Sequence, residues 1–336
     1  MAYIPHFHVT QHLLKLIEEL SAYRQKIISA TLQVPWIPLL QRDARARNTH
    51  SSTAIEGNPL TLEEVEALVD GRSLPEASKR ARREILNQLA GLKFIEKNQK
   101  RKAISQSDLF RLHKLIATHV MDQGKPGQYR TFGVRVGSYL PPPAKEVPKL
   151  MQDYLQWWNR KAQEWSAVIS SAILHYRFEA IHPFGDGNGR MGRAIALWEL
   201  YRRGFDTHHI FSVDEVYWEN RPRYYAQLDA VRKSNSDLTG WLEYSAEALH
   251  LTLERVLKRI DRLSIKQIGG KIVLTKKQEK LLHLLKDKGG MFPAEIWKEL
   301  NITKQGTMKI LKPLIAAGLI QRIGTRKSGK YEILLK

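Results

Sequence analysis

One stretch of twelve residues carries most of the chemistry that this sequence could do. It reads His182-Pro183-Phe184-Gly185-Asp186-Gly187-Asn188-Gly189-Arg190-Met191-Gly192-Arg193. Within it, His182 alone has an ordinary pKa near neutrality, which makes it the natural general base. Asp186 supplies a hard oxygen ligand, and Mg2+ is commonly held by one carboxylate together with phosphate oxygens and water. The stretch therefore offers a base and a metal-binding carboxylate close together in the chain.

The remaining residues of this motif suit an anion. Gly185, Gly187 and Gly189 allow backbone angles from which amides can converge on an anion, and a following helix N-terminus adds partial positive charge. Arg190 and Arg193 are three residues apart, on one side of the first turn of such a helix. Guanidinium groups bind phosphate oxygens in a fixed, often bidentate geometry. We therefore expect a site that handles a nucleoside triphosphate.

Two buried helices must position the motif. Apolar residues recur near helical spacing on both sides of it: Trp165, Ile169, Ile173 and Tyr176 before it, and Ala194, Leu197, Trp198 and Tyr201 after it. The glycine spacing Gly187-x-Gly189-x-x-Gly192 also fits a dinucleotide-binding fingerprint, but that fingerprint needs a preceding strand where this chain predicts a helix. The sequence has no Gly-x-x-x-x-Gly-Lys-Ser/Thr, so it has no P-loop.

The motif resembles, at every defining position, the signature of the Fic family, His-x-Phe-x-Asp/Glu-Gly-Asn-Gly-Arg-x-x-Arg. The resemblance extends over about residues 45–250 and includes two further features. Ser52-Thr53-Ala54-Ile55-Glu56-Gly57-Asn58 resembles the family's inhibitory-helix motif, Ser/Thr-x-x-x-Glu-Gly/Asn. Gly127-Gln128-Tyr129-Arg130, then Val134-Arg135-Val136-Gly137 and Pro141-Pro142-Pro143, resemble a β-hairpin flap that positions the target chain.

This resemblance implies transfer of AMP from ATP to a protein Ser, Thr or Tyr hydroxyl. His182 would deprotonate the hydroxyl, and Asp186 would hold Mg2+ on the α- and β-phosphates. Amides of the glycine loop and the side chain of Asn188 would stabilise charge at the α-phosphate. Arg190 would hold the β-phosphate and Arg193 the γ-phosphate, while Phe184 packs inward. The ATP-binding residues expected are Asp186, Gly187, Asn188, Gly189, Arg190, Met191, Gly192, Arg193, Val134, Arg135, Val136, Gly137, Tyr224 and Arg232.

Glu56, with Ser52, is expected to be inhibitory. A carboxylate that reaches Arg193 would occupy the guanidinium that the γ-phosphate needs, so ATP would bind in a non-productive pose. Gly57-Asn58-Pro59 fits a helix C-terminus just after Glu56. The alternative is a surface glutamate at a helix end without a partner, which contributes little.

The expected fold class is mainly α, with a Fic helical core, a short β-hairpin flap and a C-terminal winged-helix-like α+β module. We expect an N-terminal helical region over 1–110, with the inhibitory helix at about 45–57, and a Fic core over 111–268. The module covers 271–336, after a boundary near Gly269-Gly270. The chain has no cysteine and no apolar run of membrane-spanning length, and its N-terminus does not read as a secretory signal, so a cytoplasmic location is expected.

The C-terminal module carries an excess of positive charge. Residues 271–336 hold 15 Lys/Arg and 5 Asp/Glu, in a chain whose formal net charge is +20. Helices are expected around Leu281–Leu285, over Pro293–Leu300 and after an N-cap at Thr303, followed by strands at 321–324 and 331–334. Lys304, Lys309 and Lys312 would lie on a recognition helix, and Arg326, Lys327 and Lys330 on a wing. Such modules bind DNA or proteins.

Other functions stay open at this point. Some relatives with an inhibitory glutamate remove AMP from modified proteins, and others transfer UMP, phosphocholine or phosphate. A DNA-binding regulator with a nucleotide-sensing Fic core is a third reading. The sequence does not specify the target protein, the base preference or the oligomeric state, so self-modification and a homodimer both remain open, while no membrane partner is expected.

Overall fold

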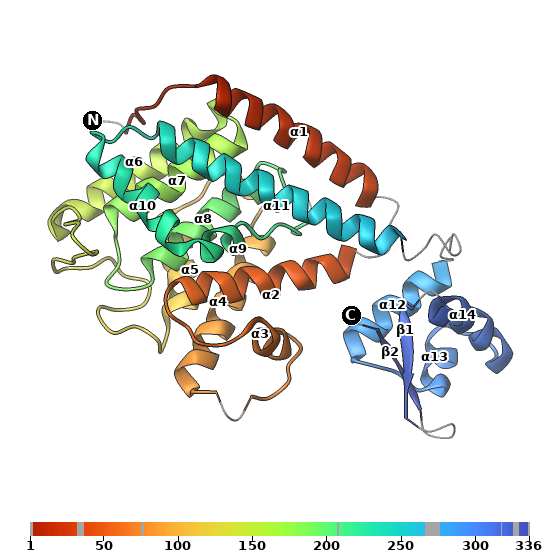
Figure 1. The fold of residues 1–336 in the computed structure, drawn as a ribbon. Coiled ribbons are helices and arrows are strands. Elements are labelled where there is room, and N and C mark those ends of the chain that lie inside the picture. Colours follow the sequence, from red (N-terminus) through yellow and green to blue (C-terminus); the bar gives the residue numbers. More distant parts are fainter. Residues whose placement is uncertain are drawn as a thin grey trace. The chain divides into compact units, whose positions relative to one another are not determined.

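The structure is a computed structural model that describes residues 3–31, 37–74, 77–206, 208–265, 276–316, 318–324 and 329–334. Its contacts divide the chain into two units, residues 1–29 with 37–257 and residues 30–36 with 258–336. The elements are α1 (Gln11–Thr31), α2 (Ile37–Ile55), α3 (Leu62–Val69), α4 (Lys79–Lys97), α5 (Gln106–Ala117), η1 (Ala144–Glu146), α6 (Val147–Arg160), η2 (Ala162–Glu164), α7 (Ala167–Ile181), α8 (Asn188–Arg202), α9 (Val213–Glu219), α10 (Arg221–Lys233), α11 (Thr239–Ile265), α12 (Lys276–Lys288), α13 (Pro293–Glu299), α14 (Lys304–Ala316), β1 (Ile320–Ile323) and β2 (Lys330–Ile333). The fold is therefore mainly helical with a small two-stranded sheet, as expected (Figure 1).

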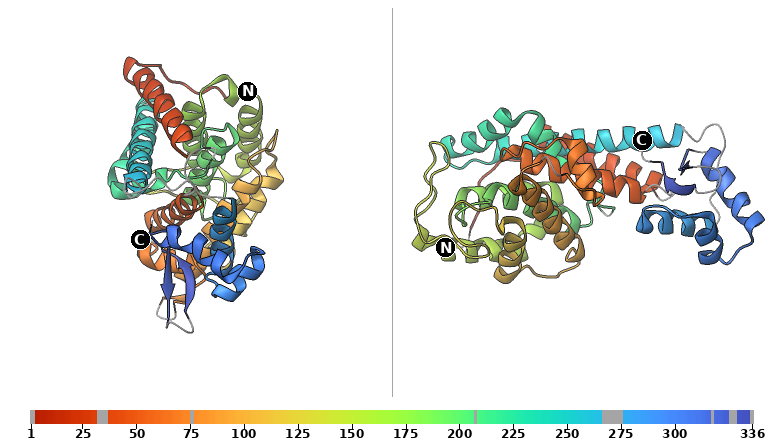
Figure 2. Two further views of the ribbon diagram at one scale, coloured as in Figure 1. Left: turned by 90° about the vertical axis from the view of Figure 1, so that its right-hand side faces the viewer. Right: turned by 90° about the horizontal axis from the view of Figure 1, so that it is seen from below.

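The first unit is entirely helical in its regular elements. Its two long helices α1 and α11 lie side by side, and the views in Figure 2 keep them together. Their contacts join His12 to Glu247 and His250 to Glu19, both at 3.1 Å. Within the described ranges, no helix combines the length and apolar character that crossing a lipid bilayer requires.

Helices α7 and α8 form the centre of this unit and carry the motif between them. Almost every residue of α7 is buried, as expected of a helix surrounded by others. Glu199 of α8 is fully buried and accepts hydrogen bonds from Trp158 Nε1 at 2.7 Å and Ser170 Oγ at 2.9 Å, so it joins α6, α7 and α8. The two buried helices predicted on either side of the motif are confirmed.

Helix α2 is part of the core of the first unit. Its residues 51–55 are all buried. Asn48 donates to Phe211 O at 2.7 Å, and Arg45 forms a forked pair with Glu96 of α4 at 2.7 and 2.9 Å. Because several independent contacts fix α2, the residue that follows its last turn has a defined position.

The chain leaves α2 through a tight turn. Gly57 has φ +97°, a left-handed conformation that favours glycine, and the predicted helix end is confirmed. The Asn58 side chain then donates to Ala81 O at 3.0 Å and to Glu84 Oε2 at 2.8 Å. These bonds attach the turn to α4, so Glu56 is held between two anchored segments.

The expected flap is less regular than a β-hairpin of two strands. Val136 and Tyr139 exchange two backbone hydrogen bonds, of 3.0 and 2.9 Å, around a turn in which Gly137 has φ +57°. This isolated bridge replaces the strand expected at Val134–Gly137. The run Pro141–Pro143 offers no backbone N–H, so the ladder cannot continue toward it.

The second unit has the predicted order of three helices and an antiparallel hairpin. Thr303 caps α14, as expected, by accepting from Gly306 N at 3.1 Å. In the sheet Ile320 lies opposite Ile333, and a further bridge pairs Met291 with Tyr331. The boundary expected at Gly269-Gly270 and the wing residues Arg326 and Lys327 lie outside the described residues.

Candidate active site

His182 follows directly after the last residue of α7 and has φ +50°, in the left-handed region. A non-glycine residue pays roughly 1–3 kcal/mol for such a conformation, which persists only where the surroundings enforce it. Burial, together with a smaller effect of the positive charge of Arg130, lowers the pKa of His182 to about 4. The nearest carboxylate oxygen, Glu179 Oε2, lies 3.7 Å from Nδ1. The imidazole is therefore neutral at neutral pH, as a general base must be.

The loop after His182 is closed by the side chain of Asn188. Its amide donates to Phe184 O and its carbonyl accepts from Phe184 N, both at 2.9 Å. The sequence assigned this side chain to the α-phosphate, but the structure uses it to hold the loop. The reason is geometric, because the loop must double back within four residues and needs a side chain to pair its backbone. Phe184 is fully buried, as predicted.

His113 of α5 supports the same loop, although no pattern in the sequence pointed to it. Its ring stacks on Phe184 with centroids 3.7 Å apart. Nδ1 accepts from Gly127 N–H at 2.8 Å, so Nε2 carries the proton and donates to Asp186 O at 3.0 Å. Burial lowers the pKa of His113 to about 4, which keeps this ring neutral.

The motif arginines are buried yet incompletely paired. Arg190 and Arg193 are 4% and 2% exposed. Among the described residues, Arg190 Nε, Arg190 Nη1 and Arg193 Nη1 are buried donors without an acceptor. Unmatched buried donors are rare in folded proteins and need an explanation. Several guanidinium N–H groups that converge at the N-terminus of α8 are what a bound polyphosphate would satisfy.

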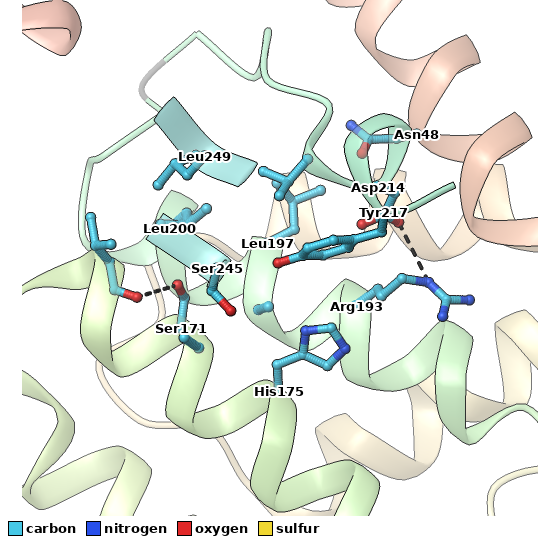
Figure 3. Close-up of a pocket in the computed structure, with 14 residues that line it drawn as sticks. Asn48, Ser171, His175, Arg193, Leu197, Leu200, Asp214, Tyr217, Ser245 and Leu249 are labelled. Atoms are coloured by element: carbon cyan, nitrogen blue, oxygen red, sulfur yellow. Dashed lines mark hydrogen bonds and ion pairs between the residues drawn. The ribbon is translucent and has the colours of Figure 1, made fainter. Parts of the chain in front are cut away.

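Arg193 forms hydrogen bonds with residues at the C-terminal end of α2 and just after it. Its Nε donates to Ser52 Oγ at 3.0 Å, and its Nη2 donates to Ser52 O at 2.8 Å and to Glu56 Oε1 at 2.7 Å. Asp214 Oδ2 also lies 3.8 Å from Nε. Figure 3 shows this second pair beside a small internal cavity that His175 and Tyr217 help to line.

Glu56 lies over the N-terminus of α8. A methyl group on Gly189 would overlap Glu56 Oε1, so the absence of a side chain there makes the approach feasible. Burial alone would raise the pKa of Glu56, but the charge of Arg193 and its hydrogen bond outweigh this effect and lower the pKa. The Glu56 carboxylate is therefore ionised at neutral pH and paired with Arg193.

Asp186 is placed at the open side of the loop. Its Oδ2 accepts from Asp122 N at 3.2 Å, its Oδ1 accepts from Gly187 N, and Arg190 Nη2 lies 3.6 Å from Oδ1. The side chain is 29% exposed. The described ranges hold no group of three or more His, Cys, Asp or Glu that could bind a metal by itself. A lone carboxylate of this kind fits a cation that brings water and phosphate ligands.

Two residues that the sequence analysis assigned to ATP, Met191 and Gly192, face the interior of the protein in the structure. Met191 is fully buried. A methyl group on Gly192 would lie 2.5 Å from Glu179 Oε1, so Gly192 faces α7. Helical geometry explains the difference, because positions 191 and 192 lie on another side of α8 from positions 190 and 193.

The remaining residues expected around the nucleoside are engaged with protein groups. Tyr224 is 1% exposed, and its hydroxyl lies 3.0 Å from His175 Nε2. Arg232 pairs with Asp229 at 2.7 Å, and its guanidinium lies 4.0 Å from the ring centre of Tyr139 in the flap. The structure thus places Tyr224 against His175 of α7, and it places Arg232 against the flap.

Taken with the fold, this geometry defines a helical protein with a neutral buried histidine beside an anion cradle. Residues 103–200 match the model of the Fic/DOC family, and this range contains the whole motif. The chain is 28% identical over 266 residues to a protein adenylyltransferase Fic from Aedes aegypti, covering 76% of this chain and 50% of that protein. It is 27% identical over 249 residues to one from Nematostella vectensis, covering 72% and 56%. The chain thus spans about half the length of the curated relatives it matches.

Solved structures agree with the family match. A Fic family protein from Desulfovibrio desulfuricans G20 superposes with a TM-score of 0.70 at 26% identity, covering 99% of both chains. Fic-1 from C. elegans has the same fold over 74% of this chain, with a TM-score of 0.63 at 23% identity. Residues 103–200 are therefore similar to the Fic/DOC family in sequence, and the chain is similar to a Fic family protein in its fold.

Proposed function

We propose that this protein is an adenylyltransferase that moves AMP from ATP to Ser, Thr or Tyr hydroxyls of a target protein or of itself. The observation that carries the proposal is the neutral, buried His182 next to unmatched guanidinium donors of Arg190 and Arg193. The similarity to proteins named protein adenylyltransferase Fic supports the same reaction.

The proposed step needs one base and a charge-stabilising cradle. His182 takes the proton of the incoming hydroxyl as the oxygen forms a bond to the α-phosphorus, and pyrophosphate leaves. The first amides of α8 lack partners within their own helix and stabilise the charge that grows on the α-phosphate. Arg190 and Arg193 hold the departing phosphates, which places the scissile bond in line with the hydroxyl.

Asp186 is the residue that would hold Mg2+. Among the described residues its partly exposed carboxylate accepts hydrogen bonds from two backbone amides, so oxygen lone pairs remain for a cation. When bound with ATP, the ion neutralises phosphate charge.

We further propose that Glu56 keeps the enzyme inactive. The Glu56–Arg193 pair uses one N–H of the guanidinium that the γ-phosphate needs, and Ser52 uses two more. ATP then binds without its α-phosphate aligned. The alternative role, in which Glu56 positions water for AMP removal, predicts the opposite response to loss of the carboxylate.

A second candidate function concerns the C-terminal unit, for which DNA binding is proposed. Lys309 and Lys312 are exposed on α14, three residues apart, in a segment with ten excess positive charges. Binding should weaken with salt by about 0.9 log units per log unit of salt for each phosphate neutralised. A mobility-shift titration on duplex DNA at several salt concentrations measures this slope, and no binding at low salt would leave a protein-docking role.

The reaction is tested by the position of the label that is transferred. The Glu56→Gly variant is incubated with Mg2+ and ATP labelled either at the α- or at the γ-phosphate. AMP transfer puts only the α-label on protein and releases pyrophosphate, and chelation of the metal or Asp186→Ala should suppress it. Transfer of the γ-label would identify a kinase and overturn the proposal.

A further inference from the structure

We propose that Arg130 is a positioning residue that locks the catalytic base to the flap, so that base and target-docking edge form one rigid piece. This inference rests on the proposed function. Arg130 belongs to the flap sequence, is 3% exposed, and hydrogen-bonds backbone carbonyls on both sides of the site.

The first side is the C-terminal end of α7. The last carbonyls of a helix have no partner within it. Arg130 Nε donates to His182 O at 2.8 Å and its Nη2 lies 3.4 Å from Ile181 O. The flap residue Tyr139 donates its hydroxyl to Ala180 O at 2.8 Å. Three successive carbonyls, including that of the base itself, are thus satisfied by flap side chains.

The second side is the flap. Arg130 Nη1 donates to Phe132 O at 3.0 Å and Nη2 to Pro142 O at 2.6 Å. These two carbonyls lie before and after the Val136–Tyr139 turn. In addition, the backbone N–H of Arg130 donates to Pro183 O at 2.9 Å. One planar guanidinium therefore joins both ends of the flap to the residues around His182, a geometry that a lysine cannot reproduce.

The hydrogen bonds of Arg130 to the end of α7 and to the flap, called the clamp below, explain the left-handed backbone of His182. The backbone of His182 is left-handed, and the bond from Arg130 to its carbonyl holds that conformation. The positive charge of Arg130 at the C-terminus of α7 is also favourable to the helix dipole. Since a small displacement of a reacting group can cost about 100-fold in rate, the clamp acts on the chemical step rather than on ATP affinity.

The charged groups that face His182 come from four segments: Glu179 from α7, Arg130 from the flap, Glu56 after α2 and Arg232 from α10. Arg130 is one of the two cations among them. A substitution that removes the positive charge of Arg130 should raise the pKa of His182. A substitution that keeps the charge but changes the shape of the side chain should leave that pKa nearly unchanged. This difference separates positioning from a general effect on folding.

The test compares Arg130→Lys and Arg130→Met in the Glu56→Gly background. Both should lower kcat for AMP transfer by about 10- to 100-fold while the Kd for ATP stays within twofold. Tyr139→Phe, which removes a single clamp bond, should give a smaller loss of the same kind. Arg203→Lys is the matched control, because Arg203 also binds two carbonyls, Ala162 O and Trp165 O, remote from the motif.

The second readout is independent of catalysis. NMR titration of the His182 imidazole should give a higher pKa in Arg130→Met than in the parent variant, and little change in Arg130→Lys. An unchanged His182 titration in Arg130→Met, or activity losses no larger than that of Arg203→Lys, would overturn the clamp. If no variant transfers AMP at all, the proposed function fails, and the imidazole titration still decides whether the clamp exists.

Discussion

The protein carries its positive charge in two different settings. In the Fic domain, Arg190 and Arg193 are buried at a helix N-terminus, with donors for which the described part of the chain offers no acceptor. In the C-terminal unit, Lys309 and Lys312 point into solvent from one helix face. Burying a guanidinium with unmatched N–H groups lowers the stability of a protein unless an anion binds there. Exposed lysines have no such effect and occur on the surfaces of many proteins. The first setting therefore indicates a specific ligand, and the second indicates only an electrostatic preference.

The largest expected effect concerns the base beside the buried arginines. In the Glu56→Gly background, His182→Ala should lower AMP transfer by about 10²–10⁴-fold, because the hydroxyl loses its general base. ATP binding, measured by calorimetry, should stay nearly unchanged, since His182 faces the acceptor. His12→Ala is the control, because His12 of α1 pairs with Glu247 of α11 and not with a residue of the motif. Transfer at the parent rate by His182→Ala would remove the histidine from the mechanism.

The two settings are compared directly by one substitution in each. Arg190→Ala should weaken ATP binding by roughly 10- to 100-fold, because each charge-assisted hydrogen bond contributes about 1.5–3 kcal/mol. Lys309→Ala should leave ATP binding unchanged and reduce only the salt dependence of DNA binding. Equal effects of both substitutions on ATP affinity would mean that bulk charge, and not the cradle, attracts the nucleotide.

The smallest expected effect is on the pH profile. Because the pKa of His182 is lowered to about 4, the base stays unprotonated as the pH falls from 7 to 5. The kcat/KM of the Glu56→Gly variant should therefore fall less than a histidine of ordinary pKa, about 6.5, would require. Burial raises the pKa of the neighbouring Glu179 to about 7, so Glu179→Gln is the control for its titration. If kcat/KM falls with an apparent pKa near 6.5, and the fall persists in the Glu179→Gln control, His182 is not the neutral, buried base that we propose.

The motif and its helices were predictable from the sequence because they rest on local patterns. Apolar spacing gave the helices around the motif, Gly57 gave the end of α2, and Thr303 gave the start of α14. The pairing of Glu56 with Arg193 was expected from two motifs, and the structure joins them across 137 positions of the chain.

The remaining features depend on contacts that no local pattern encodes. His113 reaches Asp186 O across 73 positions, and Arg130 reaches His182 O across 52. The bonds of the Asn188 side chain to Phe184 were not predicted, because an asparagine suits both a phosphate and a backbone, and these bonds depend on the path of the loop. Residue chemistry therefore identified the reacting groups, while the groups that hold them required the fold.

We propose that Glu56 withholds Arg193 from ATP, and an intact-mass measurement distinguishes this role from one in AMP removal. Wild type and Glu56→Gly are incubated with ATP and Mg2+, together with Glu56→Gly/Arg193→Ala. We expect AMP-modified protein to form about a hundredfold faster in Glu56→Gly than in wild type, which corresponds to a bias of ~2.7 kcal/mol, and the double variant to lose most of that gain. Unchanged labelling in Glu56→Gly, accompanied by loss of AMP release from a modified protein, would contradict the account and make Glu56 a catalytic group for AMP removal.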